Sequence, residues 1–362
     1  MKTVGIGVLI GISLLGWAAA QAQIQATERA AFHLPPSQTV APNTPGGGVV
    51  VGSNVYEADG AQGFIHLMPA DPANPDPVNS GILVYDPRIG SFTLGGGGVC
   101  MPFCKLGQLA YDGNQTVYVT SYDQQKGQPF SATFPGVNKL TIDPVNGYVS
   151  WNGPVAAFAG LQGNQTTSLA LGPDGNLYVG FLKNGNVVRI VNPGIDPSSD
   201  PTHTIQIVQS VGGAPNGRPV RSLTFVGPDL YLGTAEGLSV IKNAIAKTCL
   251  GGCNAVHISD GFGGVDHVGL TSDGINRIYM SINGVGVARF TINTQATQMI
   301  STGGIDATTG APTTFGFVGG HSNMLFLDRL GNLWVGDDTS DGAANFSGRV
   351  WYISAGALSS IP

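Results

Sequence analysis

A phrase of strand, turn and strand recurs down this chain of 362 residues. Its clearest copy is Ser168–Gly180, built around the letters Pro-Asp-Gly-Asn, and a second copy is Asn323–Asp337. Weaker copies begin at Gln108, Ser222 and Val268. Self-similarity at a spacing of a few tens of residues indicates an array of like structural units, so this repeat constrains the fold more than any other feature.

The chain divides into six such units, whose starts lie about 45 to 60 residues apart. Each unit holds short runs of alternating apolar residues, separated by residues that favour turns. Four short antiparallel strands per unit are typical of a β-propeller blade, whereas a parallel β-helix has shorter repeats. The sequence therefore predicts an all-β, six-bladed β-propeller of four-stranded antiparallel blades, with units near residues 48–97, 108–151, 167–211, 221–258, 267–300 and 322–353.

The first and last units differ from the others. In the last unit, only three strands precede the end of the chain, the third being Val350–Ile353. Because an open sheet edge invites aggregation, we expect Glu28–Leu34 to supply the missing outer strand and close the ring. A disordered N-terminal tail is the alternative. In the first unit we expect strands at Val49–Gly52, Asn54–Ala58, Ile82–Tyr85 and Ser91–Leu94.

The N-terminus has the features of a secretory signal. Lys2 provides the positive start, residues 4–17 form an apolar run, and alanines up to Ala22 offer a small-residue cleavage site. An uncleaved anchor is the alternative, but the run is short for crossing a bilayer. We therefore expect residues 1–22 to be removed, residues 23–47 to form the closing strand and a Pro-rich linker, and residues 48–362 to form the propeller. The mature protein is expected to be secreted or periplasmic, with no membrane span.

The charge balance excludes one class of partner. Sixteen Lys and Arg against 22 Asp and Glu give a net charge of −6, and no basic tract is present. Nucleic-acid binding needs clustered cations that replace counterions, so no nucleic-acid partner is expected. We expect a monomer that binds a small molecule or a protein at the mouth of its channel.

Four cysteines form two close pairs, Cys100 with Cys104 and Cys249 with Cys253. An even cysteine count in an exported chain favours disulfides. The blade assignment puts the two pairs on opposite faces of the ring, which disfavours a single four-cysteine metal centre. Two local disulfides, Cys100–Cys104 and Cys249–Cys253, are therefore the prediction, and two reduced thiol pairs are the alternative.

The Pro-Asp-Gly-Asn phrase, followed by Leu-Tyr-Val, resembles the repeats of NHL, SMP-30/gluconolactonase-like and streptogramin-lyase propellers. The resemblance covers most of residues 48–353. It implies a six-bladed ring. For SMP-30-like enzymes it further implies a divalent metal held by acidic and amide side chains near the channel, and for streptogramin lyases a metal-assisted His and Glu. His267 and His321 are comparable to that His. The phrase itself is a turn signal and identifies a hairpin, not an activity.

Strand directions in a blade place several polar residues at one channel mouth. His, Arg and carboxylate groups that converge can hold a metal or act as acid and base. The alternative is structural, because Asp caps turns and His often satisfies local backbone groups. Catalytic candidates are His267, His321, Arg221 and Glu57, and candidate ligands for a divalent metal such as Ca²⁺ or Mg²⁺ are Glu57, His267, His321 and Asp337.

Two functional hypotheses follow from these residues. The first is an exported, NHL-like binding or scaffold propeller that uses its channel-mouth loops. The second is a metal-assisted lactonase or lyase of the SMP-30 or streptogramin-lyase type. No Ser-elbow, phosphate-binding loop or dinucleotide fingerprint occurs, so no organic cofactor is expected.

Overall fold

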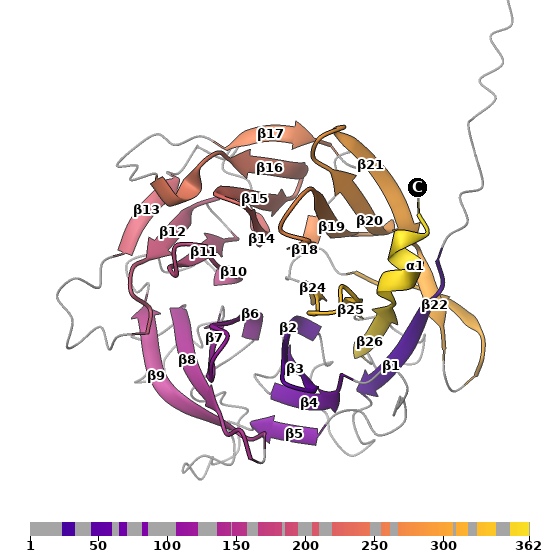
Figure 1. Ribbon diagram of the computed structural model, residues 1–362, viewed down its shortest axis with the longest axis horizontal. Coiled ribbons are helices and arrows are strands. Elements are labelled where there is room, and N and C mark those ends of the chain that lie inside the picture. The colour runs from indigo at the N-terminus through magenta and orange to yellow at the C-terminus, as the bar shows by residue number, and fades with distance from the viewer. Residues whose placement is uncertain are drawn as a thin grey trace, which may run out of the picture.

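A computed structural model of the chain shows a ring of blades around a central channel (Figure 1). The structure describes residues 24–32, 45–59, 65–70, 82–85, 106–121, 136–145, 147–157, 166–182, 185–194, 205–209, 219–246, 255–260, 267–306, 309–317, 324–337 and 348–361.

Five blades are four-stranded antiparallel sheets whose strands follow chain order from the channel outward (Figure 1). Together with the last blade of the chain, this arrangement confirms the predicted six-bladed propeller. The strands of blades 1 to 5 are β2 (Pro45–Val51), β3 (Asn54–Asp59), β4 (Ile65–Pro69) and β5 (Ile82–Tyr85); β6 (Leu106–Tyr111), β7 (Thr116–Ser121), β8 (Gly136–Ile142) and β9 (Val149–Ala157); β10 (Thr166–Leu171), β11 (Leu177–Phe181), β12 (Val187–Ile190) and β13 (Ile205–Gln209); β14 (Val220–Val226), β15 (Asp229–Thr234), β16 (Gly237–Ile241) and β17 (Val256–Ser259); and β18 (His267–Ser272), β19 (Arg277–Ile282), β20 (Gly286–Thr291) and β21 (Ala296–Ser301).

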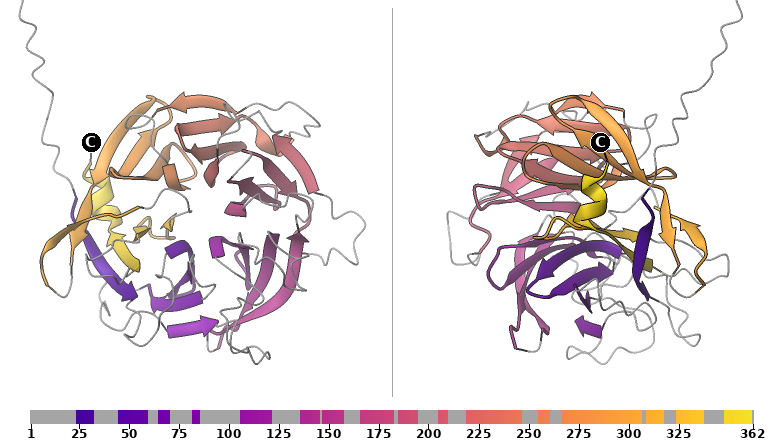
Figure 2. Two further views of the ribbon diagram at one scale, coloured as in Figure 1. Left: turned by 180° about the vertical axis from the view of Figure 1, so that it is seen from behind. Right: turned by 45° about the vertical axis from the view of Figure 1, so that its right-hand side comes forward.

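The sixth blade belongs to a larger sheet of six strands. Its order is β23-β22-β1-β26-β25-β24, so the N-terminal strand β1 lies between β26 and β22. β1 pairs antiparallel with β26 and parallel with β22. Figure 2 shows the orange β22–β23 hairpin beside indigo β1 at the outside of the ring. The strands are β1 (Ala26–Phe32), β22 (Gly303–Ile305), β23 (Pro312–Thr314), β24 (Leu325–Leu327), β25 (Leu333–Asp337) and β26 (Gly348–Ile353).

The segment expected on this blade, Glu28–Leu34, overlaps β1. That β1 holds the ring closed stays a prediction, which its deletion would test. The hairpin that flanks β1 on its other side was not expected. In blade 1 the predicted third strand was wrong: β4 (Ile65–Pro69) occupies that place, and Ile82–Tyr85 is the fourth strand. The other strand predicted for this blade, Ser91–Leu94, lies outside the described residues.

The repeated phrase forms a turn in which one aspartate does two tasks. In blade 3, Asp174 Oδ1 accepts a hydrogen bond from the backbone N–H of Asn176 at 3.2 Å, and Oδ2 accepts from the Tyr178 hydroxyl at 2.9 Å. In blade 6, Asp328 accepts from backbone N–H groups two and four residues on, and from Trp334 Nε1 at 3.1 Å. The aspartate thus caps the turn and anchors the aromatic residue of the second strand.

The asparagine of the same phrase ties this turn to the end of the third strand. In blade 3, Asn176 Oδ1 accepts from the backbone N–H of Asn192 at 3.2 Å. In blades 5 and 6, the equivalent Asn276 and Asn332 accept from the backbone N–H groups of Asn293 and Ala355, each at 2.9 Å. Much of the repeated sequence is therefore explained by the internal structure of a blade.

The hydrophobic core lies between neighbouring blades. One cluster joins Ala110 and Tyr118 of blade 2 to Leu169, Val179 and Phe181 of blade 3, and all five are buried. Basic side chains add a second kind of contact. Lys139, Arg189 and Arg289, on the third strands of blades 2, 3 and 5, donate to carbonyl oxygens beyond the third strand of the next blade, those of Gly194 (3.0 Å), Ile245 (2.7 Å) and Ile361 (3.3 Å).

The short helices cover blade ends. The 3₁₀-helix η4 (Ala244–Ala246) follows β16, and α1 (Ala355–Ser359) follows β26. Ser354 caps α1 by accepting from the backbone N–H of Ala357 at 3.1 Å. Within the described residues, no helix is long and apolar enough to cross a membrane.

Candidate functional site

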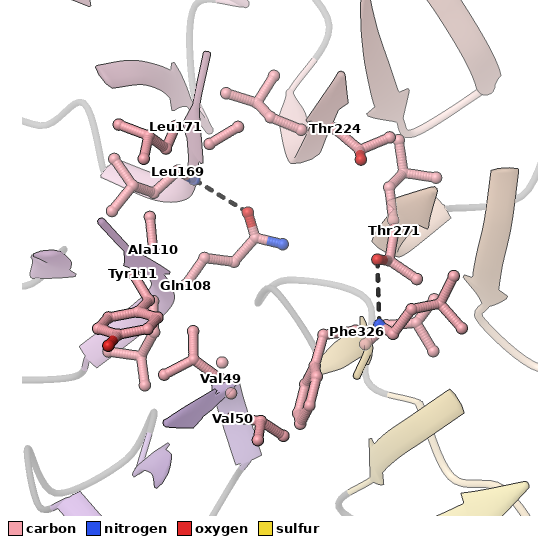
Figure 3. Close-up of a pocket in the computed structure, with 18 of the residues that line it drawn as sticks. Val49, Val50, Gln108, Ala110, Tyr111, Leu169, Leu171, Thr224, Thr271 and Phe326 are labelled. Atoms are coloured by element: carbon pink, nitrogen blue, oxygen red, sulfur yellow. Dashed lines mark hydrogen bonds between the residues drawn. The ribbon is translucent and has the colours of Figure 1, made fainter. Parts of the chain in front are cut away.

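A cavity of about 470 Å³ occupies the central channel (Figure 3). The inner strands of all six blades contribute side chains and backbone to its wall, which exposes polar and apolar surface to a similar extent. Figure 3 shows these side chains surrounding an open centre. The lining includes Val49, Val50, Leu109, Ala110, Tyr111, Leu169, Ala170, Leu171, Leu223, Phe225, Leu270, Leu325, Phe326 and Leu327.

The cavity lies toward the face that carries the first-to-second strand turns. Its wall begins at Gly47 and Gln108 and reaches the β24–β25 turn at Asp328 and Arg329. The strand directions expected from the sequence favoured the opposite mouth, where the inner strands start. Arg329 is exposed and places a positive charge at the rim.

Each inner strand is the edge of its sheet and has no neighbouring strand on the channel side. Side chains of the adjacent blade therefore accept hydrogen bonds from some of its backbone N–H groups. The Leu169 N–H donates to Gln108 Oε1 at 2.9 Å, from blade 3 to blade 2. The Leu327 N–H donates to Thr271 Oγ1 at 3.3 Å, from blade 6 to blade 5. These bonds fix the spacing of the blades around the cavity.

Two of the predicted site residues lie at adjacent strand starts. His267 is the first residue of β18 and is fully buried, and Arg221 lies near the start of β14 with 9% exposure. Between them, Ser222 Oγ donates to the His267 carbonyl oxygen at 3.3 Å. Both residues lie at register shifts in the first ladders of blades 4 and 5, where pairing moves between Val220 and Ser222 and between His267 and Gly269.

Glu57 lies in the strand interior of blade 1. It pairs with Gly48, and the equivalent pairs of the other blades join apolar residues. At the Glu57 position these blades have Val119, Val179, Leu232, Met280 and Val335. Glu57 is fully buried like its counterparts, and this burial raises the pKa of its carboxyl well above the ordinary value of 4.5.

Glu57→Gln is expected to stabilise the protein at pH 8 and to leave its stability nearly unchanged at pH 4. A carboxyl whose pKa is raised by folding does not lower the free energy of unfolding at a pH below its unfolded pKa. Above that pH, the loss of stability grows as the pH rises toward the folded pKa. Each whole pKa unit is worth about 1.4 kcal/mol. Urea unfolding from pH 4 to 8 measures the difference, with Glu236→Gln as control. An equal effect of Glu57→Gln at both pH values would contradict the expectation.

Asp337 has a structural contact. Its Oδ2 accepts from Trp351 Nε1 at 2.7 Å, and both side chains are fully buried. In the ladder Asp337 pairs with Arg349, on the strand that adjoins β1. The carboxylate therefore takes part in the packing of the last blade.

Several predictions fall outside the described residues. These are His321 and the proposed disulfides Cys100–Cys104 and Cys249–Cys253. Among the residues that the structure describes, no three His, Cys, Asp or Glu side chains form a group that could hold a metal ion. Metal-assisted lactonase or lyase chemistry therefore stays a prediction of the resemblance. Gln108 was not among the residues predicted from the sequence, although it differs from its equivalents in the other copies of the repeat.

Comparison with known proteins supports the fold. No protein-family model matches the chain, and no curated protein sequence matches it. Among solved structures, it is similar to a structural genomics protein of unknown function from Bacteroides thetaiotaomicron (TM-score 0.51, 14% identity, 91% of this chain and 73% of that one). It is also similar to a luciferin-regenerating enzyme (0.50, 9%, 90% and 96%) and to the calcium-binding protein regucalcin from Agrobacterium tumefaciens (0.49, 14%, 86% and 93%).

At these identities the similarity is one of fold. The six-bladed propeller fold that the repeated phrase implies is confirmed by the strand order, and these neighbours support the fold alone.

Proposed function

We propose that this chain is an exported binding propeller whose central channel takes a small, largely apolar ligand. The observation that supports the proposal most is the 470 Å³ cavity. Its volume falls in the range of about 300 to 1,000 Å³ that is usual for small-molecule sites. Such sites combine apolar surface with polar groups that orient the ligand, and the channel offers both.

The wall favours an apolar ligand for an energetic reason. Leu171 on β10, Leu223 and Phe225 on β14, and Phe326 on β24 line the same cavity from three inner strands. Transfer of apolar surface from water into such a wall contributes about 25 cal/mol per Å². The chain carries a net charge of −6, and the cationic Arg329 at the rim also admits a ligand with a polar or anionic end.

A neutral fluorescent ketone, 6-propionyl-2-(dimethylamino)naphthalene, tests the proposal, because its emission moves to the blue in apolar surroundings. We expect saturable binding at one site. Ala170 lines the cavity and also packs against the core between blades 3 and 4, so Ala170→Phe, in a variant whose urea midpoint is retained, is expected to weaken binding about tenfold or more. Leu330→Ser is the control, since Leu330 is 77% exposed on a nearby turn and does not line the cavity.

Two results would overturn the proposal. One is binding that does not saturate. The other is binding that survives Ala170→Phe and is lost in Leu330→Ser, since the dye would then adhere to exposed apolar turns.

A further inference from the structure

One side chain in the channel has an amide group directed at the open centre. Gln108, on β6, is 7% exposed, and Figure 3 shows its amide nitrogen pointing toward the middle of the cavity. Other polar groups of the wall already take part in local bonds. Thr271 Oγ1 accepts from the Leu327 N–H, and Thr224 Oγ1 donates to Ser272 Oγ at 3.2 Å.

The orientation of this amide follows from its partner. Gln108 Oε1 is 2.9 Å from the backbone nitrogen of Leu169. A backbone N–H only donates, so the amide must turn its oxygen to Leu169. The NH₂ group is then left on the channel side. The same bond holds a backbone group of blade 3, so the orientation is part of the fold.

Gln108 is also the exception among its equivalents. Each inner strand has a residue at this place, immediately before the one that pairs with the Glu57 position. The six residues are Gly47, Gln108, Ser168, Ser222, Gly269 and Met324. Of these, Gly47 and Gln108 line the cavity.

Gly47 allows the close approach of the neighbouring strand. A Cβ on it would lie 2.6 Å from Gln108 Cα and 2.6 Å from the Gly107 carbonyl oxygen. The backbone of blade 1 therefore packs directly against the Gln108 backbone and helps to hold the side chain on the channel side.

We propose that Gln108 Nε2 donates a hydrogen bond to an acceptor oxygen of the ligand, so that the channel selects apolar molecules with a carbonyl group over hydrocarbons of the same shape. This inference rests on the proposed function. A hydrocarbon that fills the channel would displace water from this donor and leave it without an acceptor, which is costly, so a ligand that supplies an acceptor gains affinity. We expect a preference of about tenfold or more.

The test compares two probes of nearly equal shape. One is the naphthyl ketone above, and the other carries a propyl group in place of its propionyl group. The unaltered protein is expected to bind the ketone about tenfold or more tightly than the hydrocarbon. Equal affinities would overturn the role of Gln108 and leave the proposed function standing. Failure of both probes to bind would remove the proposed function itself.

Gln108→Glu separates the two tasks of the side chain. A carboxylate still accepts from the Leu169 N–H but has no donor for the channel. We expect this variant to lose the preference for the ketone, and Gln115→Glu, on an exposed turn of the same blade, to keep it. Gln108→Met provides a second variant without a donor if the carboxylate impairs folding. Retention of the preference in folded Gln108→Met would overturn the proposal.

Discussion

Deletion of β1 is expected to lower the free energy of unfolding by roughly 5 kcal/mol, because each lost ladder hydrogen bond is worth about 1 kcal/mol. β1 pairs with β26 over residues Thr27 to Phe32 and with β22 through Ala26 and Thr27. Ala26 is also 1% exposed and belongs to the apolar cluster around Trp351. Without β1, the edges of β22 and β26 lose their partner, so we expect aggregation as well.

The measurement compares a chain that starts at Gln23 with one that starts at His33. Urea unfolding gives the stability and gel filtration gives the association state. A synthetic peptide of residues 23–33 is expected to restore the urea midpoint when added in excess, and a scrambled peptide is the control. Equal midpoints for the two chains would show that the last blade is stable on its own three strands, and the predicted closure would be wrong.

The repeated phrase predicted the ring because it encodes local structure. Asp174 and Asp328 cap the same kind of turn in two different blades. Asn176 joins such a turn to the end of the third strand. Contacts of this kind lie within one repeat, so they can be recognised in the sequence. The number of copies then gives the number of blades.

The elements that were missed depend on contacts between distant segments. β22 and β23 are three residues each and contain Gly303, Gly304 and Pro312, which are poor strand formers. They become strands because β1 offers a partner to β22. Gly304 is required there, since a Cβ on it would lie 2.4 Å from the Trp351 ring. Tertiary pairing of this kind leaves no local signal.

The candidate site shows a similar division. Glu57, His267 and Asp337 were selected because their side chains can titrate or bind metals, yet all three are fully buried in strands. Residue type alone does not distinguish such positions from a site. Gln108 stands where other copies have Ser168 and Gly269, so the repeat alignment does contain the difference. The Leu169 N–H of the next blade orients the Gln108 amide toward the channel. This contact joins two blades, so the sequence of one repeat does not reveal it.

Arg349→Ala is expected to destabilise the protein by about 3–5 kcal/mol, the usual cost of removing one partner of a buried ion pair. Arg349 Nη1 lies 2.9 Å from Asp306 Oδ2, and the two side chains are 8% and 12% exposed. Arg349 is on β26, and Asp306 directly follows β22. The ion pair thus joins the two segments that flank β1. The Arg349 guanidinium also lies 5.9 Å from the Trp351 ring, so its loss affects the packing of the same cluster.

A double-mutant cycle separates the ion pair from this packing. Asp306→Ala is expected to cost a similar amount, and the double variant is expected to cost less than the sum of the two, because neither charge is then left buried alone. Lys242→Ala is the control, since its pair with Asp229 has 62% exposure at Lys242 and exposed pairs contribute at most about 1 kcal/mol. Losses that add without coupling would show that Arg349 acts through Trp351 alone. If the cycle shows coupling, the ion pair contributes directly to holding the segment after β22 against β26, the two strands between which β1 lies.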